Sequence, residues 1–156
     1  MNAKTIFISG VILLAAITVY FYLHLQPETL TCSAKNYLHL ESQTQGGKIE
    51  GEVLLVFRIS SATEGRVSQV GSLVIQGKHY AVDRNVVLKF IGKDHDGYRQ
   101  TRRVAIVKNK NDNVPDEITE LLMSRQDIFY YKVVRIAGNV YGIRDLRRTL
   151  MVCRAA

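Results

Sequence analysis

The sequence predicts a mainly β protein, with a single N-terminal transmembrane helix followed by a small antiparallel β-barrel or sandwich that includes one short helix. Three observations support this. The N-terminus holds one long uncharged apolar run, most of the remaining chain alternates between apolar and polar residues, and turn-forming residues interrupt that alternation at short intervals. Many short strands with one helix are typical of a curled antiparallel sheet, and the pattern leaves barrel and sandwich both open.

The apolar run extends from Thr5 to Leu25 and contains no Asp, Glu, Lys or Arg. A helix of this length, rising about 1.5 Å per residue, spans roughly 30 Å, the thickness of a bilayer's hydrocarbon core. Lys4 and the amino terminus are the only charges before it. The positive-inside rule therefore predicts that residues 1–4 are cytoplasmic, that residues 5–25 form a membrane anchor, and that residues 26–156 form a domain across the membrane, which is a periplasmic domain if the membrane is a bacterial inner membrane.

A cleaved secretory signal is the competing interpretation of the same run. A signal peptide would have a shorter apolar core and a small-x-small cleavage site. Here the run ends instead in bulky residues, from Val19 to His24, which are typical of a span leaving through the headgroup region. A retained anchor is favoured. The residues before Cys32 also lack the small side chains of a lipoprotein cleavage site.

Residues 26–156 are long enough for one domain with a modest core, and they carry a net charge of +6 once Lys4 is set aside. Because this domain is predicted to lie outside the cytoplasm, we expect no direct nucleic-acid partner. Membrane lipid headgroups, an acidic partner face or an anionic amphiphile are the expected contacts of such a surface. A merely solvated basic surface is the alternative.

The two cysteines, Cys32 and Cys153, lie near the start and the end of the predicted domain. In an oxidising compartment such a pair indicates one intramolecular disulfide. Two independent buried thiols are the alternative. The chain has no C-x-x-C motif and no clustered Cys/His ligand set, so neither a redox site nor a structural zinc site is indicated.

Strand patterns fill most of the domain. The clearest begins at Lys48, where every second residue from Ile49 to Ile59 falls on one face, and Glu50, Glu52 and Arg58 are among those on the other. Further strands are expected over residues 66–76, over 80–90 as one bent strand or two short ones, and over 98–107, 128–137, 140–143 and 149–153. The last of these is a candidate edge for pairing with another chain.

Turn and helix signals separate the strands. The residues from Asp94 to Gly97 form the clearest break, and a hairpin explains them better than a calcium loop, whose third acidic ligand and distal Glu are missing. Residues 109–114 are expected to form a loop. Pro115, Asp116 and Glu117 then open a short helix with Ile118, Leu121 and Leu122 at helical spacing.

The sequence predicts no catalytic, metal or cofactor site. The four histidines have no ligand-like or triad-like companions at useful spacing, and no phosphate-binding glycine pattern or nucleophile elbow is present. The candidate contacts for an anionic ligand or partner are arginines, which bind carboxylates and sulfonates bidentately; solvated strand edges are the alternative for them. These candidates are Arg102, Arg103, Arg144, Arg147 and Arg148.

Several segments together resemble a known family. They are the short N-terminal anchor, the T-C-S-A that follows it, the alternating strand GEVLLVFRIS, the segment NDNVPDEITELL and the closing MVC. The chain is similar over nearly its whole length to the FidL-like family of small inner-membrane proteins. Val114 to Glu117 and the two cysteine contexts carry most of this resemblance, and they are fold markers with no catalytic role attached.

The resemblance implies an accessory role. Members of the family are encoded beside membrane-anchored regulators of the ToxR type, which combine a cytoplasmic winged-helix DNA-binding domain with a small periplasmic domain. In the analogous ToxR/ToxS and VtrA/VtrC pairs the second protein stabilises that periplasmic domain, and a joint barrel of the VtrC type holds bile salt. By analogy, a non-enzymatic partner that senses or stabilises is expected here. A stand-alone periplasmic binding module and a structural subunit of an envelope complex are the other classes left open.

Overall fold

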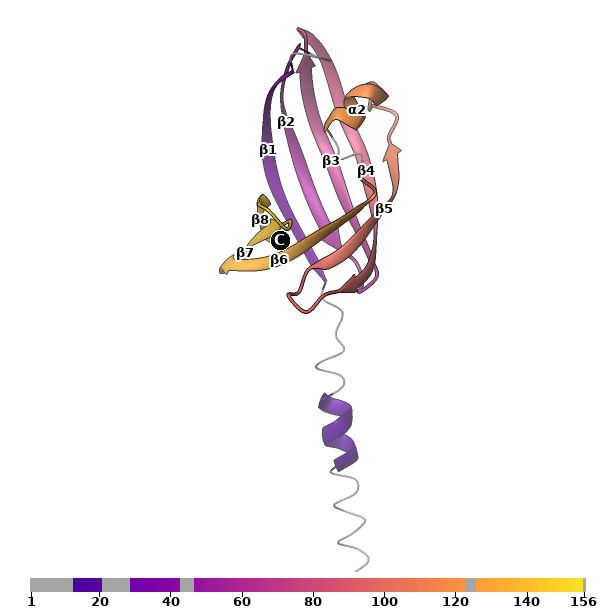
Figure 1. Ribbon diagram of the computed structural model, residues 1–156, viewed down its shortest axis with the longest axis vertical. Helices are drawn as coiled ribbons and strands as arrows, with labels where there is room; N and C mark the ends of the chain where they lie inside the picture. Colours follow the sequence, from indigo (N-terminus) through magenta and orange to yellow (C-terminus); the bar gives the residue numbers. More distant parts are fainter. Residues whose placement is uncertain (1–12, 21–28, 43–46, 123–125, 156) are drawn as a thin grey trace, which may run out of the picture.

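A computed structural model shows an eight-stranded antiparallel barrel with one short helix (Figure 1). The structure describes residues 13–20, 29–42, 47–122 and 126–155. The strands follow one another around the barrel in chain order. They are β1 (Leu30–Ser42), β2 (Gly47–Ile59), β3 (Glu64–Ile75), β4 (Lys78–Lys93), β5 (Arg99–Lys108), β6 (Ile128–Ala137), β7 (Val140–Arg144) and β8 (Thr149–Ala155), with helix α2 (Asp116–Leu122) between β5 and β6.

Alternation accounts for the long strands. In β2 the predicted face from Ile49 to Ile59 points inward, with Ile49, Val53, Phe57 and Ile59 buried. Residues 80–90 form part of one continuous strand, β4, and not two short ones. The expected hairpin at Asp94 is present, since the Tyr98 N–H donates to the Asp94 carboxylate and Gly97 has a positive φ of 83°.

The sequence reasoning missed the first strand. β1 pairs with β2 along its whole length, from Leu30 opposite Ile59 to Ser42 opposite Gly47. Its inward positions carry Leu30, Cys32, Leu38 and Leu40, so a period-2 signal was present. Ala34 and Asn36 interrupt that signal in the middle of the strand.

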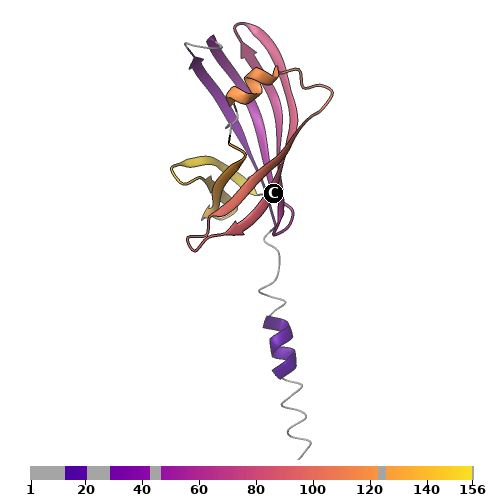
Figure 2. The same cartoon turned by 45° about the vertical axis from the view of Figure 1, so that its right-hand side comes forward.

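The barrel has two ends, which we name from β1. The proximal end is where the chain enters β1 at Leu30, and the distal end is where β1 finishes at Ser42. Strands β1 to β5 make the tall curved wall, whereas β6, β7 and β8 lie toward the proximal end (Figures 1 and 2). Consistent with this, β5 pairs with β6 only from Arg99 to Arg102, and β8 pairs with β1 only at Cys32 and Ser33.

Each end has its own apolar core. The proximal core contains the ring of Tyr131 edge-on to Phe57 and Phe90, with centroid distances of 5.3 and 5.6 Å. Cys32 and Cys153 belong to this core and form a disulfide, as predicted, with their Cα atoms 5.4 Å apart. The distal core consists of Ile49, Val53, Leu73, Ile75, Val82 and Val114.

The predicted anchor lies mostly outside the described residues. Of the run from Thr5 to Leu25, only residues 13–20 are described, and they are helical. In the described parts of the chain, no helix has the length and apolar character needed to cross a membrane. The large apolar side chains of this stretch are exposed, among them Leu13, Leu14 and Ile17.

Candidate functional site

The distal half of the barrel is covered by the segment from Asn109 to Leu122, which we call the cover segment. Beyond Lys108 it follows the edge of β4, where the Asn109 N–H donates to the carbonyl of Asp83 and the Asn113 N–H donates to that of Ala81. It then turns and places α2 across the concave side of the distal strands (Figures 1 and 2). Val114 is buried in the distal core, and Ile118 packs against that core. The cover segment therefore closes the part of the distal half that β6, β7 and β8 do not reach.

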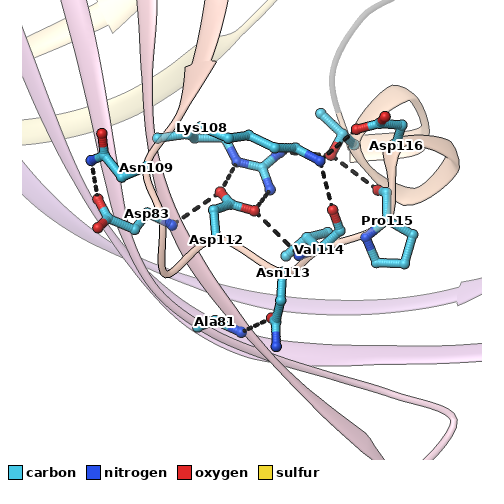
Figure 3. Close-up of polar contacts among 11 residues, drawn as sticks. Ala81, Asp83, Lys108, Asn109, Asp112, Asn113, Val114, Pro115 and Asp116 are labelled. Atoms are coloured by element: carbon cyan, nitrogen blue, oxygen red, sulfur yellow. Dashed lines mark hydrogen bonds and ion pairs between the residues drawn. The ribbon is translucent and has the colours of Figure 1, made fainter.

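A buried ion pair fastens the cover segment to the sheet (Figure 3). Arg84 points inward from β4, and its Nε and Nη2 donate to the two carboxylate oxygens of Asp112 at 2.6 and 2.7 Å. Its Nη1 donates to the hydroxyl of Thr119 on α2 at 2.7 Å. Both charged side chains are almost fully buried, at 3% and 0% exposed. All three of these hydrogen bonds from the Arg84 guanidinium therefore end on the cover segment.

The electrostatics of Asp112 follow from this geometry. Burial opposes its ionisation, but the hydrogen bonds from Arg84, from the Asp83 N–H and from the Val114 N–H, together with the charge of Arg84, outweigh burial. The pKa of Asp112 is therefore held below its ordinary value, and the carboxylate is ionised at neutral pH.

Outer contacts complete the attachment (Figure 3). The Lys108 ammonium donates to the carbonyl of Val114 at 2.7 Å and to the Asp116 carboxylate. The Ala81 N–H donates to the side-chain oxygen of Asn113 at 2.7 Å. The predicted loop and helix thus form one structural unit.

Beside the cover segment the concave face contains a hollow of about 220 Å³. Its lining combines apolar side chains with three polar ones and consists of Asn36, Leu38, Val53, Leu55, Gln69, Leu73, Val82 and Arg84. Sites for drug-sized ligands usually measure about 300 to 1,000 Å³. The hollow as it stands suits a smaller molecule.

Two strand edges in the distal half lack a neighbouring strand. Within the described ranges, β1 has no strand partner beyond Ser33 on the side away from β2, and β5 has none beyond Arg102 on the side away from β4. Strand β8, the edge suggested by the sequence, pairs with β7 and also meets β1. The longest available edge is therefore β1 from Ala34 to Ser42, which sequence reasoning missed together with the strand itself.

The five candidate arginines do not form one site. Arg102 is exposed on β5, whereas the side chain of Arg103 is only 17% exposed and pairs with Asp127 at 2.9 Å. Arg144 ends β7 on the other side of β6, which separates it from the β5 pair. Arg147 and Arg148 lie in the turn that follows. That turn is closed by Asp145, whose pKa is held below its ordinary value by the N–H groups of Arg147 and Arg148.

The tyrosines and acidic residues show no catalytic arrangement in the part of the chain that the structure describes. Tyr131 is a core residue, Tyr130 is exposed, and Tyr141 lines a second hollow near Leu30. Among the described residues, no group of three or more His, Cys, Asp or Glu side chains is placed to hold a metal ion.

Comparison with known families decides the affiliation. Residues 71–153 match the model of the family described as FidL-like putative membrane protein. The chain belongs to the FidL-like family. The matched region runs from β3 through the cover segment to Cys153, while the T-C-S-A and GEVLLVFRIS segments of the resemblance lie before it. Comparison with curated proteins and with solved structures gives no match.

Proposed function

We propose that this FidL-like protein is a non-enzymatic, single-pass inner-membrane accessory protein whose periplasmic domain stabilises a ToxR-type membrane-bound regulator. The observation that carries the proposal is the pair of unpaired distal strand edges. An exposed edge presents a row of unsatisfied N–H and C=O groups, and a strand of another protein satisfies them by pairing. If the regulator's small periplasmic domain contributes that strand, the pairing satisfies backbone groups of both proteins and so stabilises the regulator's domain as well as the edge of the barrel.

The membrane anchor is part of the proposal. The uncharged run from Thr5 to Leu25 supports it, as does the exposure of Leu13, Leu14 and Ile17 in the described helical stretch, because a helix that is apolar on all sides is stable in lipid. The disulfide supports an oxidising compartment for the barrel. Together they favour an N-terminus in the cytoplasm and a barrel in the periplasm.

An anionic amphiphile, such as a bile salt, is the proposed signal. The partly apolar hollow beside the cover segment supports a ligand of this class, but its volume of about 220 Å³ is small for one. A partner strand on β1 or β5 would extend the wall of the hollow, so the joint assembly is the proposed receptor. The exposed residues Arg102, Arg144, Arg147 and Arg148 are candidates for contacting the anionic group or the partner, whereas Arg103 is engaged by Asp127.

The test compares an edge variant with a matched control in cells that contain the regulator. Tyr37 is 70% exposed on the outer face of the edge strand β1, and Val70 is 52% exposed on the outer face of β3, which has a neighbour on each side. Tyr37→Lys should shorten the regulator's lifetime and lower transcription from its target promoter, whereas Val70→Lys should leave both unchanged. Equal behaviour of the two variants would exclude the β1 edge as the contact. If deleting the whole protein changes neither readout, with or without bile, the accessory function is wrong.

A further inference from the structure

The outer surface of the barrel changes its charge from one end to the other. At the distal end, oppositely charged side chains neutralise one another: Lys35 on β1 pairs with Glu52 on β2 at 2.7 Å, and Lys48 pairs with Glu50 along β2 at 2.9 Å. At the proximal end strands β2 to β5 carry Arg58, Arg66, Lys89 and Arg102, one on each strand and all exposed. We call these four residues the proximal basic stripe. Among the described residues, none of the four forms an ion pair.

The register places like charges side by side within the stripe. Arg58 on β2 lies directly opposite Arg66 on β3, and Lys89 on β4 lies directly opposite Arg102 on β5. Arg66 is opposite Val87, so Lys89 is its diagonal neighbour. Lys89 also has Glu64 of β3 directly opposite it, whereas Arg58 and Arg66 face only each other, Thr31 and Val87. Like charges directly opposite on neighbouring strands destabilise a sheet, so the Arg58–Arg66 pair favours an external counter-charge. This cost is absent at the neutralised distal end.

A hollow lies within the stripe. It measures about 400 Å³ and is lined by Arg58, Arg66 and Lys89, with Glu64 as the one acidic side chain and Val87 and Val104 among the apolar ones. Three cations against one carboxylate leave an excess of positive charge where a phosphate group would fit. Arginine binds phosphate oxygens bidentately, and lysine binds them as a point charge.

The short segment between the apolar run and β1 limits how far the proximal basic stripe can lie from the proposed anchor. Leu30 opens β1 at this end of the barrel, and the apolar run ends at Leu25. The intervening backbone reaches at most roughly 17 Å when fully extended. If the run is anchored as proposed above, the stripe is held at the membrane side of the barrel, within about two screening lengths of the surface at physiological salt. An inverted barrel, with its distal end toward the lipid, exceeds this reach.

We propose that the proximal basic stripe binds the phosphate headgroups of anionic phospholipids in the membrane that anchors the chain, and so holds the barrel with its cover segment and free edges away from the bilayer. This inference rests on the proposed anchor. Each basic side chain near an anionic surface contributes attraction equivalent to about a fivefold change in the ratio of docked to undocked protein. The apolar part of the hollow, at Val87 and Val104, is open to the same headgroup region.

The experiment uses the full chain in nanodiscs of zwitterionic phosphatidylcholine, with or without about a third of anionic phosphatidylglycerol. A fluorophore on Ala62→Cys, in the exposed β2–β3 turn, reports the proximal end, and one on Asn111→Cys reports the distal end. Quenching by nitroxide-labelled lipid headgroups should be stronger for the proximal label, and stronger in anionic than in zwitterionic discs. The difference should weaken at high salt.

Two double variants with the same change of charge separate the stripe from overall charge. Arg66→Gln with Lys89→Gln should lower the docked-to-undocked ratio more than tenfold, whereas Lys35→Gln with Lys48→Gln should leave it unchanged. Because the stripe variant removes like-charge contacts, it should also melt at the same temperature as the parent protein or higher, which rules out misfolding as the cause.

The remaining outcomes would overturn the proposal. Equal quenching in both kinds of disc, or in the stripe variant and the parent, would mean that the stripe does not contact the lipid. Loss of quenching with inorganic phosphate, but not with chloride of equal ionic strength, would assign the hollow to a free small anion. A chain that enters neither kind of disc would refute the anchor itself, and the docking geometry with it.

Discussion

The buried pair of Arg84 and Asp112 should determine how firmly the cover segment is held. In Asp112→Asn the side chain keeps its shape but loses its charge, and its amide group turns N–H donors toward the guanidinium. Arg84, which is 3% exposed, is then left as a buried charge without its counter-ion. Breaking a buried pair by removing one partner costs about 3 to 5 kcal/mol. Because this ion pair attaches the cover segment to β4, we expect the lost free energy to weaken docking of the cover segment.

Amide hydrogen exchange provides a local assay. The Ala81 N–H donates to the side chain of Asn113, so its protection depends on the docked cover segment, and the substitution does not alter that bond directly. A loss of about 3 kcal/mol should speed its exchange by roughly a hundredfold or more. Asp116→Asn is the control, because Asp116 is 86% exposed and its pairing with Lys108 is worth at most about 1 kcal/mol.

The same assay has a defined dependence on pH. The pKa of Asp112 is lowered in the folded protein, so its contribution is fully present above the unfolded value near 3.8 and is lost as the pH falls through the lower, folded value. Protection of the Ala81 amide should therefore decline in acid for the parent protein and be nearly insensitive to acid in Asp112→Asn. If Asp112→Asn and Asp116→Asn accelerate exchange equally, the buried pair does not hold the segment and the reasoning fails.

Three further predictions concern the disulfide, the barrel curvature and the topology. Cys32→Ala or Cys153→Ala should lower the melting temperature, with the double variant costing little more than one alone, because closing a loop over a sequence separation of 121 is worth about 4 to 5 kcal/mol by chain entropy; two thiols that alkylate without prior reduction would contradict the bridge. Gly71→Val should destabilise the barrel by several kcal/mol in thermal denaturation, since even a Cβ there would lie 2.1 Å from the carbonyl oxygen of Glu52; an unchanged melting temperature would refute that close approach. Alkaline phosphatase fused after Ala156 should be active at the full fused length; an inactive fusion would refute the periplasmic barrel, and a shortened one the retained anchor.

A structural feature could be predicted from the sequence where the residues that determine it lie close together along the chain. The alternation from Ile49 to Ile59 is local and uninterrupted, so its inward face could be assigned correctly. Strand β1 has the same period, but Asn36 at an inward position weakens it. Closure as a barrel depends on strand stagger around the whole sheet, which no single segment encodes, so barrel and sandwich could not be separated.

The buried ion pair was not predictable for a related reason. Arg84 and Asp112 lie 28 residues apart, and each occurs in a segment with other charged residues, where it resembles a surface side chain. Only the path of the cover segment along β4 brings them together. The proximal basic stripe is similar, since its four residues lie on four different strands and only the register aligns them. The sequence suggested a basic surface but did not locate it.

The seam between β1 and β8 also affects how the chain folds. The first and last strands meet at only two residue pairs, Cys32 with Ala155 and Ser33 with Arg154, and the bridge to Cys153 reinforces them. Synthesis proceeds at about 5 to 20 residues per second, so β1 waits on the order of 6 to 24 seconds for its last neighbour to be made. During that time β2 and β3 can pair with it in sequence, but the circle stays open. If the barrel is exported to the periplasm as proposed, export delivers a growing meander with an exposed leading edge. The final step is then formation of the disulfide that closes the ring, and a chain released too early would lack that step.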